Sequence, residues 1–215
     1  ETLDEQRQIA EGYGKTPTEY LNDLGVFELP TLAAHSVYLN DTDIEILKAH
    51  NVGIAHNPTS NLKLASGIAN IPKYLQAGLN VGLGTDGCSS NNTLNMFKEM
   101  AICSFVQKVN AMNPTVLPAE EILNMATIGG EKVLRWDDEI GTLEVGKKAD
   151  LILVDIDKPH FAPWNNPVSD LVYSAQGSDV KTTIVNGKIL MKDYEVLTLD
   201  VERIMAETER IARNV

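Results

Sequence analysis

Three polar residues stand where apolar stretches end, and their side chains could do chemistry together. They are His35 in TLAAHSVYL, His56 in VGIAHNP and Asp86 in VGLGTDGCSSNN. A buried carboxylate needs a cation or several hydrogen-bond donors nearby. A metal ion would supply the cation, and histidine is a common companion ligand. The residue types therefore favour a metal site or an acid–base site.

Each of these residues also has a structural interpretation. A lone histidine in an apolar stretch is commonly a hydrogen-bonded core residue, and this holds for both His35 and His56. Asp86 could cap the helix that follows it, although the polar run at 89–92 is better placed to do so. Cys88 could act as a nucleophile, but no triad order supports that role. Spacing alone leaves the metal, acid–base and structural interpretations open.

The elements that would position these residues alternate through the first two thirds of the chain. Apolar runs predict buried strands at 31–39, 52–58 and 80–87. Helical patterns lie at 3–13, 17–24, 40–50, 71–78 and 93–109, with Thr16 and the run from Asn40 as N-cap candidates. Such alternation predicts parallel β/α units, whose active sites lie at the carboxyl ends of the strands.

The pattern changes after Gly141. The segments 149–157, 180–191 and 194–198 are β-rich, and Asn186–Gly187 is a hairpin signal. An amphipathic helical pattern closes the chain from about residue 200. We therefore divide the chain into a β/α unit at 1–140, a β-rich segment at 141–199 and a C-terminal helix at 200–215.

Charge and composition exclude some partners. The 215 residues carry a net charge of −12, which argues against nucleic acid and against anionic membrane surfaces. No apolar run reaches the length of a membrane span. The two cysteines, Cys88 and Cys103, are too few for a disulfide framework, so a reducing cytoplasm is the expected location.

Four ordered blocks carry a family resemblance. They are AAHSVYLNDTDIEIL, GIAHNPTSNLKLASGIANIP, NVGLGTDGCSSNN and IGTLEVGKKADLILVD. Together they resemble the amidohydrolase superfamily, in particular its branch of methylthioadenosine/S-adenosylhomocysteine deaminases and chlorohydrolase-like enzymes. The resemblance implies an α/β fold: strands six to eight of a metal-dependent (β/α)8 barrel, of the TIM type, plus part of a small β-sandwich.

The resemblance also implies roles for particular residues. Asp86 matches the strand-eight aspartate that binds the metal and serves as general base. Glu1, in the opening ET, resembles the end of an H-x-x-E-T motif whose glutamate contacts the purine ring. His35 matches a strand-six histidine that contacts the hydrolytic water or the substrate. Asn57, with Ser60 and Asn61, is a candidate for lining the substrate pocket, and Asn57 is equally a candidate for fixing its loop.

The chain departs from the family pattern in one large respect. It has no His-x-His pair, and the fifth-strand histidine would precede residue 1. A complete barrel needs about 250 residues, so the chain resembles the C-terminal half of a longer protein. The expected cofactor is one divalent metal, zinc or alternatively iron, which this half does not retain alone. We therefore expect the isolated half to be inactive and its missing N-terminal half to be its partner.

The function implied by the resemblance is hydrolytic deamination of a purine nucleoside such as 5'-methylthioadenosine or S-adenosylhomocysteine. Guanine or cytosine deaminases and triazine chlorohydrolases share the same metal chemistry and remain alternatives. A different class is a non-catalytic scaffold or assembly domain. An incomplete barrel exposes open strand edges and an apolar inner face, which favour self-association into a homo-oligomer.

Overall fold

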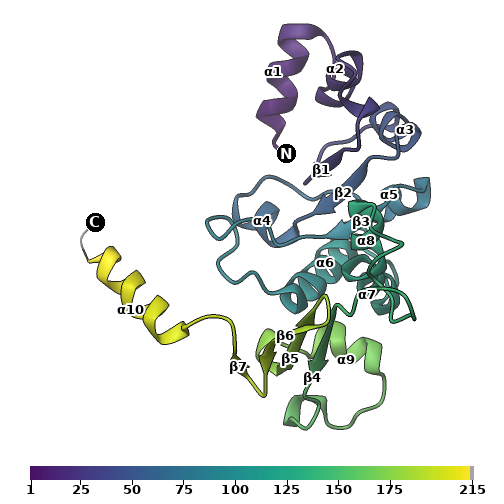
Figure 1. The fold of residues 1–215 in the computed structure, drawn as a ribbon. Helices are drawn as coiled ribbons and strands as arrows, with labels where there is room; N and C mark the ends of the chain where they lie inside the picture. The colour runs from purple at the N-terminus through teal and green to yellow at the C-terminus, as the bar shows by residue number, and fades with distance from the viewer. Residues whose placement is uncertain (214–215) are drawn as a thin grey trace.

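The strand ends that carry His35, His56 and Asp86 belong to one sheet. The computed structural model describes residues 1–213 and contains two sheets. The first is parallel, in the order β1-β2-β3, with strands β1 (Leu32–Ala34), β2 (Gly53–His56) and β3 (Val81–Leu83). The second is antiparallel, with strands β4 (Leu151–Val154), β5 (Val180–Val185), β6 (Lys188–Lys192) and β7 (Glu195–Val196) (Figure 1).

Helices connect and cover the parallel sheet. The helices of the first half are α1 (Leu3–Tyr13), α2 (Pro17–Asp23), α3 (Asp41–Ala49), α4 (Pro58–Lys63), α5 (Ile71–Ala77) and α6 (Met96–Asn110). The later ones are α7 (Ala119–Ala126), α8 (Ile128–Leu134), α9 (Pro167–Tyr173) and α10 (Val201–Ala212). Short 3₁₀ helices lie at Val26–Glu28, Pro159–Phe161 and Gly177–Asp179.

The predicted caps of α2 and α3 are confirmed. Thr16 accepts the amide hydrogen of Glu19, whose side chain in turn accepts from the backbone of Thr16. Asn40 and Asp43 form the same reciprocal arrangement at the start of α3. Each pair satisfies two amide groups that the first helical turn leaves without partners. These local signals therefore fix where both helices begin.

The hydrophobic core lies between the parallel sheet and the helices. Ile54 of β2 is fully buried and Val81 of β3 is 2% exposed, and both belong to one cluster with residues of α3, α5, α6 and α7. Val172 of α9 also belongs to this cluster, so the C-terminal part of the chain shares the core. This common packing gives the strand ends a rigid base.

Small residues let α8 approach the sheet backbone. A Cβ added at Gly53 would lie 2.8 Å from the carbonyl oxygen of Val133, and one added at Gly82 would lie 2.9 Å from the Cα of Gly130. Real Cβ atoms do not come that close to backbone atoms, so both positions require glycine. Helix α8, which the sequence pattern did not predict, therefore packs directly on β2 and β3.

Several expected boundaries are wrong. The strand predicted at 31–39 ends at Ala34, because His35 and Ser36 adopt left-handed backbone angles, with φ of 64° and 49°. The strand predicted at 52–58 ends at His56, and Pro58 begins α4, a helix that was not predicted. The polar run at 89–92 does not cap α6, since Asn95 accepts the amide hydrogens of Phe97 and Lys98.

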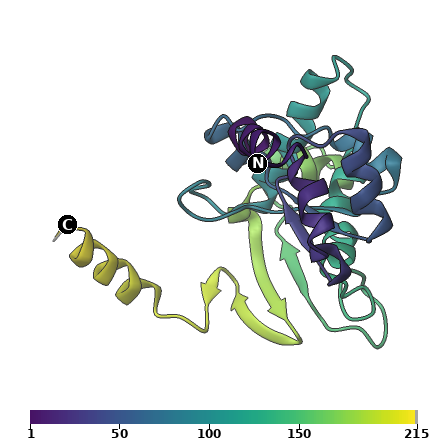
Figure 2. The same cartoon turned by 90° about the horizontal axis from the view of Figure 1, so that it is seen from above.

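The C-terminal part differs from the expectation in detail. The Asn186–Gly187 hairpin joins β5 to β6 as predicted. Of the expected β-sandwich, the described residues contain one layer, the four-stranded antiparallel sheet β4–β7. Helix α10 stands away from the rest of the chain, and all its residues are exposed (Figures 1 and 2). No helix within residues 1–213 is long and apolar enough to cross a membrane.

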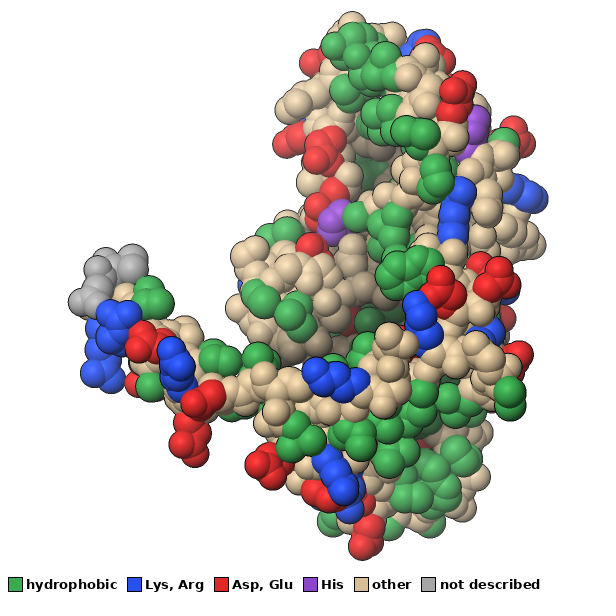
Figure 3. Space-filling view, in the orientation of Figure 1, with side chains coloured by type: hydrophobic (Ala, Val, Ile, Leu, Met, Phe, Trp, Pro, Cys, Tyr) green, Lys and Arg blue, Asp and Glu red, His purple; other side chains and the backbone are tan. Residues whose placement is uncertain are grey.

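The surface view shows apolar side chains exposed over α1 and α2, and a hollow below them (Figure 3). Leu3, Leu21 and Leu24 are more than a third exposed, and so is Leu32 of β1. Acidic and histidine side chains lie at the edge of the hollow.

We predict opposite effects for two glycine-to-alanine substitutions. Gly82→Ala would force β3 away from α8 and lower the free energy of unfolding by about 1–3 kcal/mol. Gly12→Ala, in the open space of α1, would leave stability unchanged or raise it by up to about 1 kcal/mol. Urea unfolding of both variants measures the difference. Equal stability of the two variants would contradict the close packing of α8.

Candidate active site

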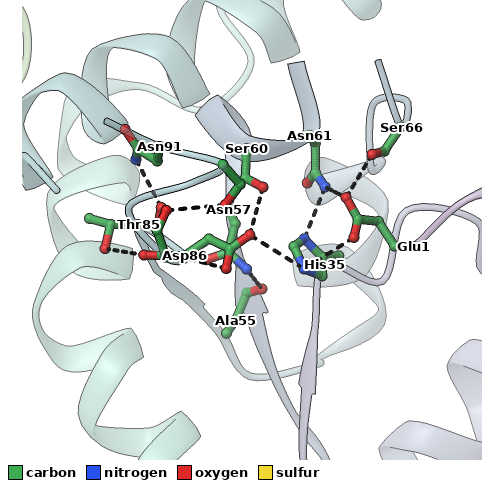
Figure 4. Close-up of polar contacts among 12 residues, drawn as sticks. Glu1, His35, Ala55, Asn57, Ser60, Asn61, Ser66, Thr85, Asp86 and Asn91 are labelled. Carbon is green, nitrogen blue, oxygen red and sulfur yellow. Dashed lines mark hydrogen bonds and ion pairs between the residues drawn. The ribbon is translucent and has the colours of Figure 1, made fainter. Parts of the chain in front are cut away.

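Parallel strands bring three predicted site residues to one edge of the sheet. His35 directly follows β1, and Asp86 lies three residues after β3. Glu1 lies just before α1 and reaches the same edge, as Figure 4 shows. The Nε2 atom of His35 is 3.4 Å from a carboxylate oxygen of Glu1 and 3.8 Å from one of Asp86. These residues, 34 and 51 positions apart in sequence, therefore form one polar cluster.

His35 occupies a strained position in this cluster. Its φ of 64° lies in the left-handed region, which a residue with a Cβ rarely adopts. The conformation turns the chain out of β1 and places the imidazole between the two carboxylates, with the side chain 16% exposed. Strain of this kind is concentrated at functional sites. The ring is thus a link between Glu1 and Asp86 rather than a residue of the apolar core.

Asn61 of α4 fixes the orientation of His35. Its side-chain nitrogen donates to Glu1 Oε1 at 3.2 Å and lies 3.0 Å from Nδ1 of His35. A carboxylate oxygen can only accept, so the amide nitrogen and not its oxygen faces this pair. Nδ1 of His35 therefore accepts, and neutral His35 carries its hydrogen on Nε2, the atom nearest to Glu1 and Asp86.

Glu1 is held by a second donor that the sequence reasoning missed. Ser66, in the loop after α4, donates its hydroxyl to Glu1 Oε1 at 2.6 Å. Ser66 and Asn61 are both buried. Ser66 lies within the block GIAHNPTSNLKLASGIANIP, but nothing in its local spacing shows that it reaches a residue 65 positions away. Two buried donors thus fix one carboxylate oxygen of Glu1.

Asp86 is an anchored anion. The Ser60 hydroxyl donates to Oδ2 at 2.6 Å, and the amide of Gly87 donates to Oδ1 at 2.6 Å. The hydrogen bond from Ser60, followed by those from Ser90 and Gly87, lowers the pKa of Asp86, and the nearby His35 adds to this effect. The side chain is 32% exposed, so the ionised carboxylate faces open space.

Asn57 takes the second of its two predicted roles. It is buried and donates to the carbonyl oxygen of Ala55 at 3.2 Å. Its side-chain oxygen lies only 2.3 Å from where a Cβ at Gly84 would be, so glycine at 84 makes room for it. Asn57 therefore fixes the loop after β2 in this arrangement, and its contact with a substrate stays a prediction.

His56 lies outside the polar cluster. It is 2% exposed, and neither ring nitrogen has a hydrogen-bond partner among residues 1–213. Burial lowers its pKa to about 3, and charge on His35 contributes in the same direction. His56 is therefore a neutral imidazole in the core, which matches the structural alternative for this residue, although without the hydrogen bonds expected there.

The donor set fits part of a metal site. Asp86 offers an ionised oxygen ligand beside the imidazole of His35. Within the described residues, no group of three histidine, cysteine, aspartate or glutamate side chains could hold a metal ion. Cys88 is exposed in the loop after Asp86. A metal bound at Asp86 would thus need further ligands from outside residues 1–213.

We predict that Ser60→Ala raises the pKa of Asp86, because the variant removes the largest contribution to its stabilised charge. Titration of the Asp86 carboxyl carbon by ¹³C NMR measures the change. Ser89→Ala is the matched control, since Ser89 lies in the same loop and is exposed. The explanation fails if Ser60→Ala leaves the pKa of Asp86 where it was.

Burial of neutral His56 predicts a pH dependence of stability. Between its ordinary pKa of 6.5 and its folded pKa of about 3, the unfolded chain binds a proton that the folded chain does not. The free energy of unfolding should therefore fall as the pH is lowered, by up to about 1.4 kcal/mol per unit from this residue. His56→Leu should reduce this fall between about pH 7 and pH 5 in urea unfolding. If the unfolding free energy falls equally with pH in both proteins, His56 is not a neutral buried imidazole.

Comparisons with known proteins identify the family of this chain. The amidohydrolase family model matches residues 1–190. The chain is 54% identical over its whole length to a 5-methylthioadenosine/S-adenosylhomocysteine deaminase from Caldanaerobacter subterraneus, of which it covers 50%. It is 49% identical over its whole length to a 5'-deoxyadenosine deaminase from Methanosarcina mazei, of which it covers 49%.

A solved structure is similar over the complete chain. It is an adenosine deaminase from Xanthomonas campestris with bound zinc, 33% identical, with a TM-score of 0.94. The match covers 100% of this chain and 49% of that one. The chain therefore spans about half the length of the curated relatives it matches. With the family model matching residues 1–190 and the polar cluster at the strand ends, this chain belongs to the amidohydrolase family.

Proposed function

We propose that this chain is the C-terminal part of a metal-dependent hydrolytic deaminase that acts on adenosine-type nucleosides, such as 5'-methylthioadenosine and S-adenosylhomocysteine. The observation that carries the proposal is the meeting of Glu1, His35 and Asp86 at the carboxyl ends of parallel strands. The two relatives above are named for deamination of such nucleosides, which supports the substrate class. In this proposal β1, β2 and β3 are barrel strands six, seven and eight.

A divalent metal, zinc in the first place, would be held by Asp86 with further ligands from outside this chain. When bound, such a metal lowers the pKa of a coordinated water toward about 7 and so makes hydroxide available at neutral pH. The zinc in the Xanthomonas protein supports this choice of metal. The carboxylate of Asp86 suits iron as well.

Asp86 is suited to act as the base. Its carboxylate is ionised because Ser60 and Gly87 stabilise the charge, and it faces open space beside His35. It accepts a proton from water as the oxygen attacks the ring carbon that bears the amino group. The same proton then passes from Asp86 to the departing amine. The products are the 6-oxo purine nucleoside and ammonia.

Glu1 acts on the ring nitrogen, and His35 acts on the attacking oxygen, beside Asp86. Glu1, protonated on the oxygen that Asn61 and Ser66 do not contact, gives this proton to the ring nitrogen, so negative charge does not accumulate on the purine. As the amine departs, the hydroxyl formed by the attacking oxygen returns a proton to Glu1, which leaves the 6-oxo group. The Nε2 hydrogen of His35, directed by Asn61 at the opposite ring nitrogen, donates to the attacking oxygen. Asn57 and Ser60 lie beside Asp86 and His35 in Figure 4, and in this proposal they line the substrate pocket.

The proposal predicts that the chain alone does not turn over nucleosides, because a zinc ion bound by one carboxylate lacks the ligands of a catalytic site. A chimera supplies the missing zinc ligands: the N-terminal half of the Caldanaerobacter protein is joined to Glu1 of this chain. We expect the purified chimera to bind zinc and to release ammonia from 5'-methylthioadenosine. Asp86→Asn in the chimera should lower kcat by at least about a thousandfold.

The control and the competing substrates decide between the alternatives. Glu120→Gln changes an exposed carboxylate of α7 and should leave the rate unchanged. Guanine, cytosine and a chlorinated triazine are assayed in parallel for ammonia or chloride release. A folded, zinc-loaded chimera that hydrolyses one of these and no adenosine-type nucleoside would refute the substrate class. A folded chimera without any hydrolysis would favour a scaffold role.

A further inference from the structure

Glu99 is a fully buried carboxylate that the mechanism above does not use. It lies in the first turns of α6 with no exposed surface. Its Oε1 accepts from the side-chain amide of Asn91 at 2.6 Å, and its Oε2 accepts from the backbone amide of Thr59 at 3.1 Å. Burying a carboxylate is costly unless it is well hydrogen-bonded. Its two partners lie on the two segments that hold Asp86.

The first segment is the loop after β3. Asn91 is fully buried, and the nitrogen that donates to Glu99 also donates to the carbonyl oxygen of Thr85 at 2.8 Å (Figure 4). Thr85 precedes Asp86, whose φ of 59° lies in the left-handed region. A non-glycine residue stays there only when its surroundings hold it. Glu99 thus orients the side chain that fixes this turn.

The second segment is α4. The side chain of Asn57, which precedes this helix, makes no capping hydrogen bond and is turned toward Ala55 instead. Instead, the backbone amide of Thr59 in the first turn of α4 donates a hydrogen bond to Glu99. The next residue is Ser60, whose hydroxyl donates to Asp86. One carboxylate of α6 therefore contacts both the loop that carries Asp86 and the helix that carries its donor Ser60.

We propose that Glu99 is a positioning residue for Asp86, acting through Asn91 and Thr85 on one side and through Thr59 and Ser60 on the other. This inference rests on the proposed function only for its kinetic consequence. The geometric part concerns this chain alone and can be tested without a metal or a substrate.

The first test uses the chain as it is. Glu99→Gln keeps the shape of the side chain, but one of its two acceptor oxygens becomes an NH₂ group that faces a donor. We expect the amide resonance of Gly87, which reports its hydrogen bond to Asp86, to move upfield in ¹H–¹⁵N spectra. Amide exchange at Gly87 and Thr59 should become faster. The control Glu120→Gln should change neither the Gly87 resonance nor the exchange rates of the two amides.

A double variant separates positioning from mere stability. In Glu99→Gln with Asn91→Asp, the glutamine nitrogen can donate to the new carboxylate, and its oxygen can still accept from Thr59. The new carboxylate has no hydrogen to donate to the carbonyl oxygen of Thr85. We expect resistance to urea to recover in part, because the contact between the new side chains at positions 99 and 91 is restored and the donor to Thr85 is not, while the Gly87 resonance stays displaced. Recovery of both would overturn the route through Thr85.

The second test uses the zinc-loaded chimera described above. Substitution of groups that orient metal ligands typically costs about 10–100-fold in metal affinity or activity. We expect Glu99→Gln to weaken zinc binding, measured by chelator competition, within that range and to lower kcat more than it raises KM. Unchanged zinc affinity and an unchanged Gly87 resonance, with only reduced stability, would overturn the proposal. If the unsubstituted chimera is inactive, the proposed function fails, while the Gly87 measurement still decides the role of Glu99.

Discussion

The candidate site depends on one electrostatic constraint: Asp86 must stay ionised beside a second carboxylate, Glu1. Hydrogen bonds from a hydroxyl and a backbone amide meet that constraint by stabilising the charged form. The imidazole of His35 lies between the two acids, and its hydrogen is directed toward them by Asn61. Glu1 has its own donors on the other side. The cluster is therefore a set of acceptors separated by oriented donors, an arrangement suited to moving protons.

The parallel sheet makes this cluster possible by its geometry. Strand β2 separates β1 from β3, and at about 4.8 Å between adjacent strands their ends are about 10 Å apart, a gap that the side chains of His35 and Asp86 close. Small residues on β2 and β3 allow α8 to pack on the backbone, and the large apolar residues of the same strands pack into the helical layer. The candidate site residues at the strand ends thus rest on the packed core of the sheet and its helices.

Local chemistry explains which features could be predicted. The caps at Thr16 and Asn40 and the Asn186–Gly187 turn follow from neighbouring residues, and the parallel pairing of the strands follows from the β/α alternation. His35 and Asp86 were singled out by their places at the ends of apolar stretches, whereas Glu1 and the roles of all three came from the family resemblance. The end of β1 was missed because its left-handed turn has no glycine signal. Ser66 and Glu99 act through contacts across 65 and 40 positions, which no local pattern encodes.

Helix α10 buries none of its residues against the rest of the described chain. All twelve of its residues face solvent, including Val201, Ile204, Met205 and Ile211. A helix of that length holds together only weakly in water when packing does not support it. Its folded population is consequently governed by its own cap at Asp200 and by ion pairs along its surface, and not by the cooperative melting of the sheet and its helices.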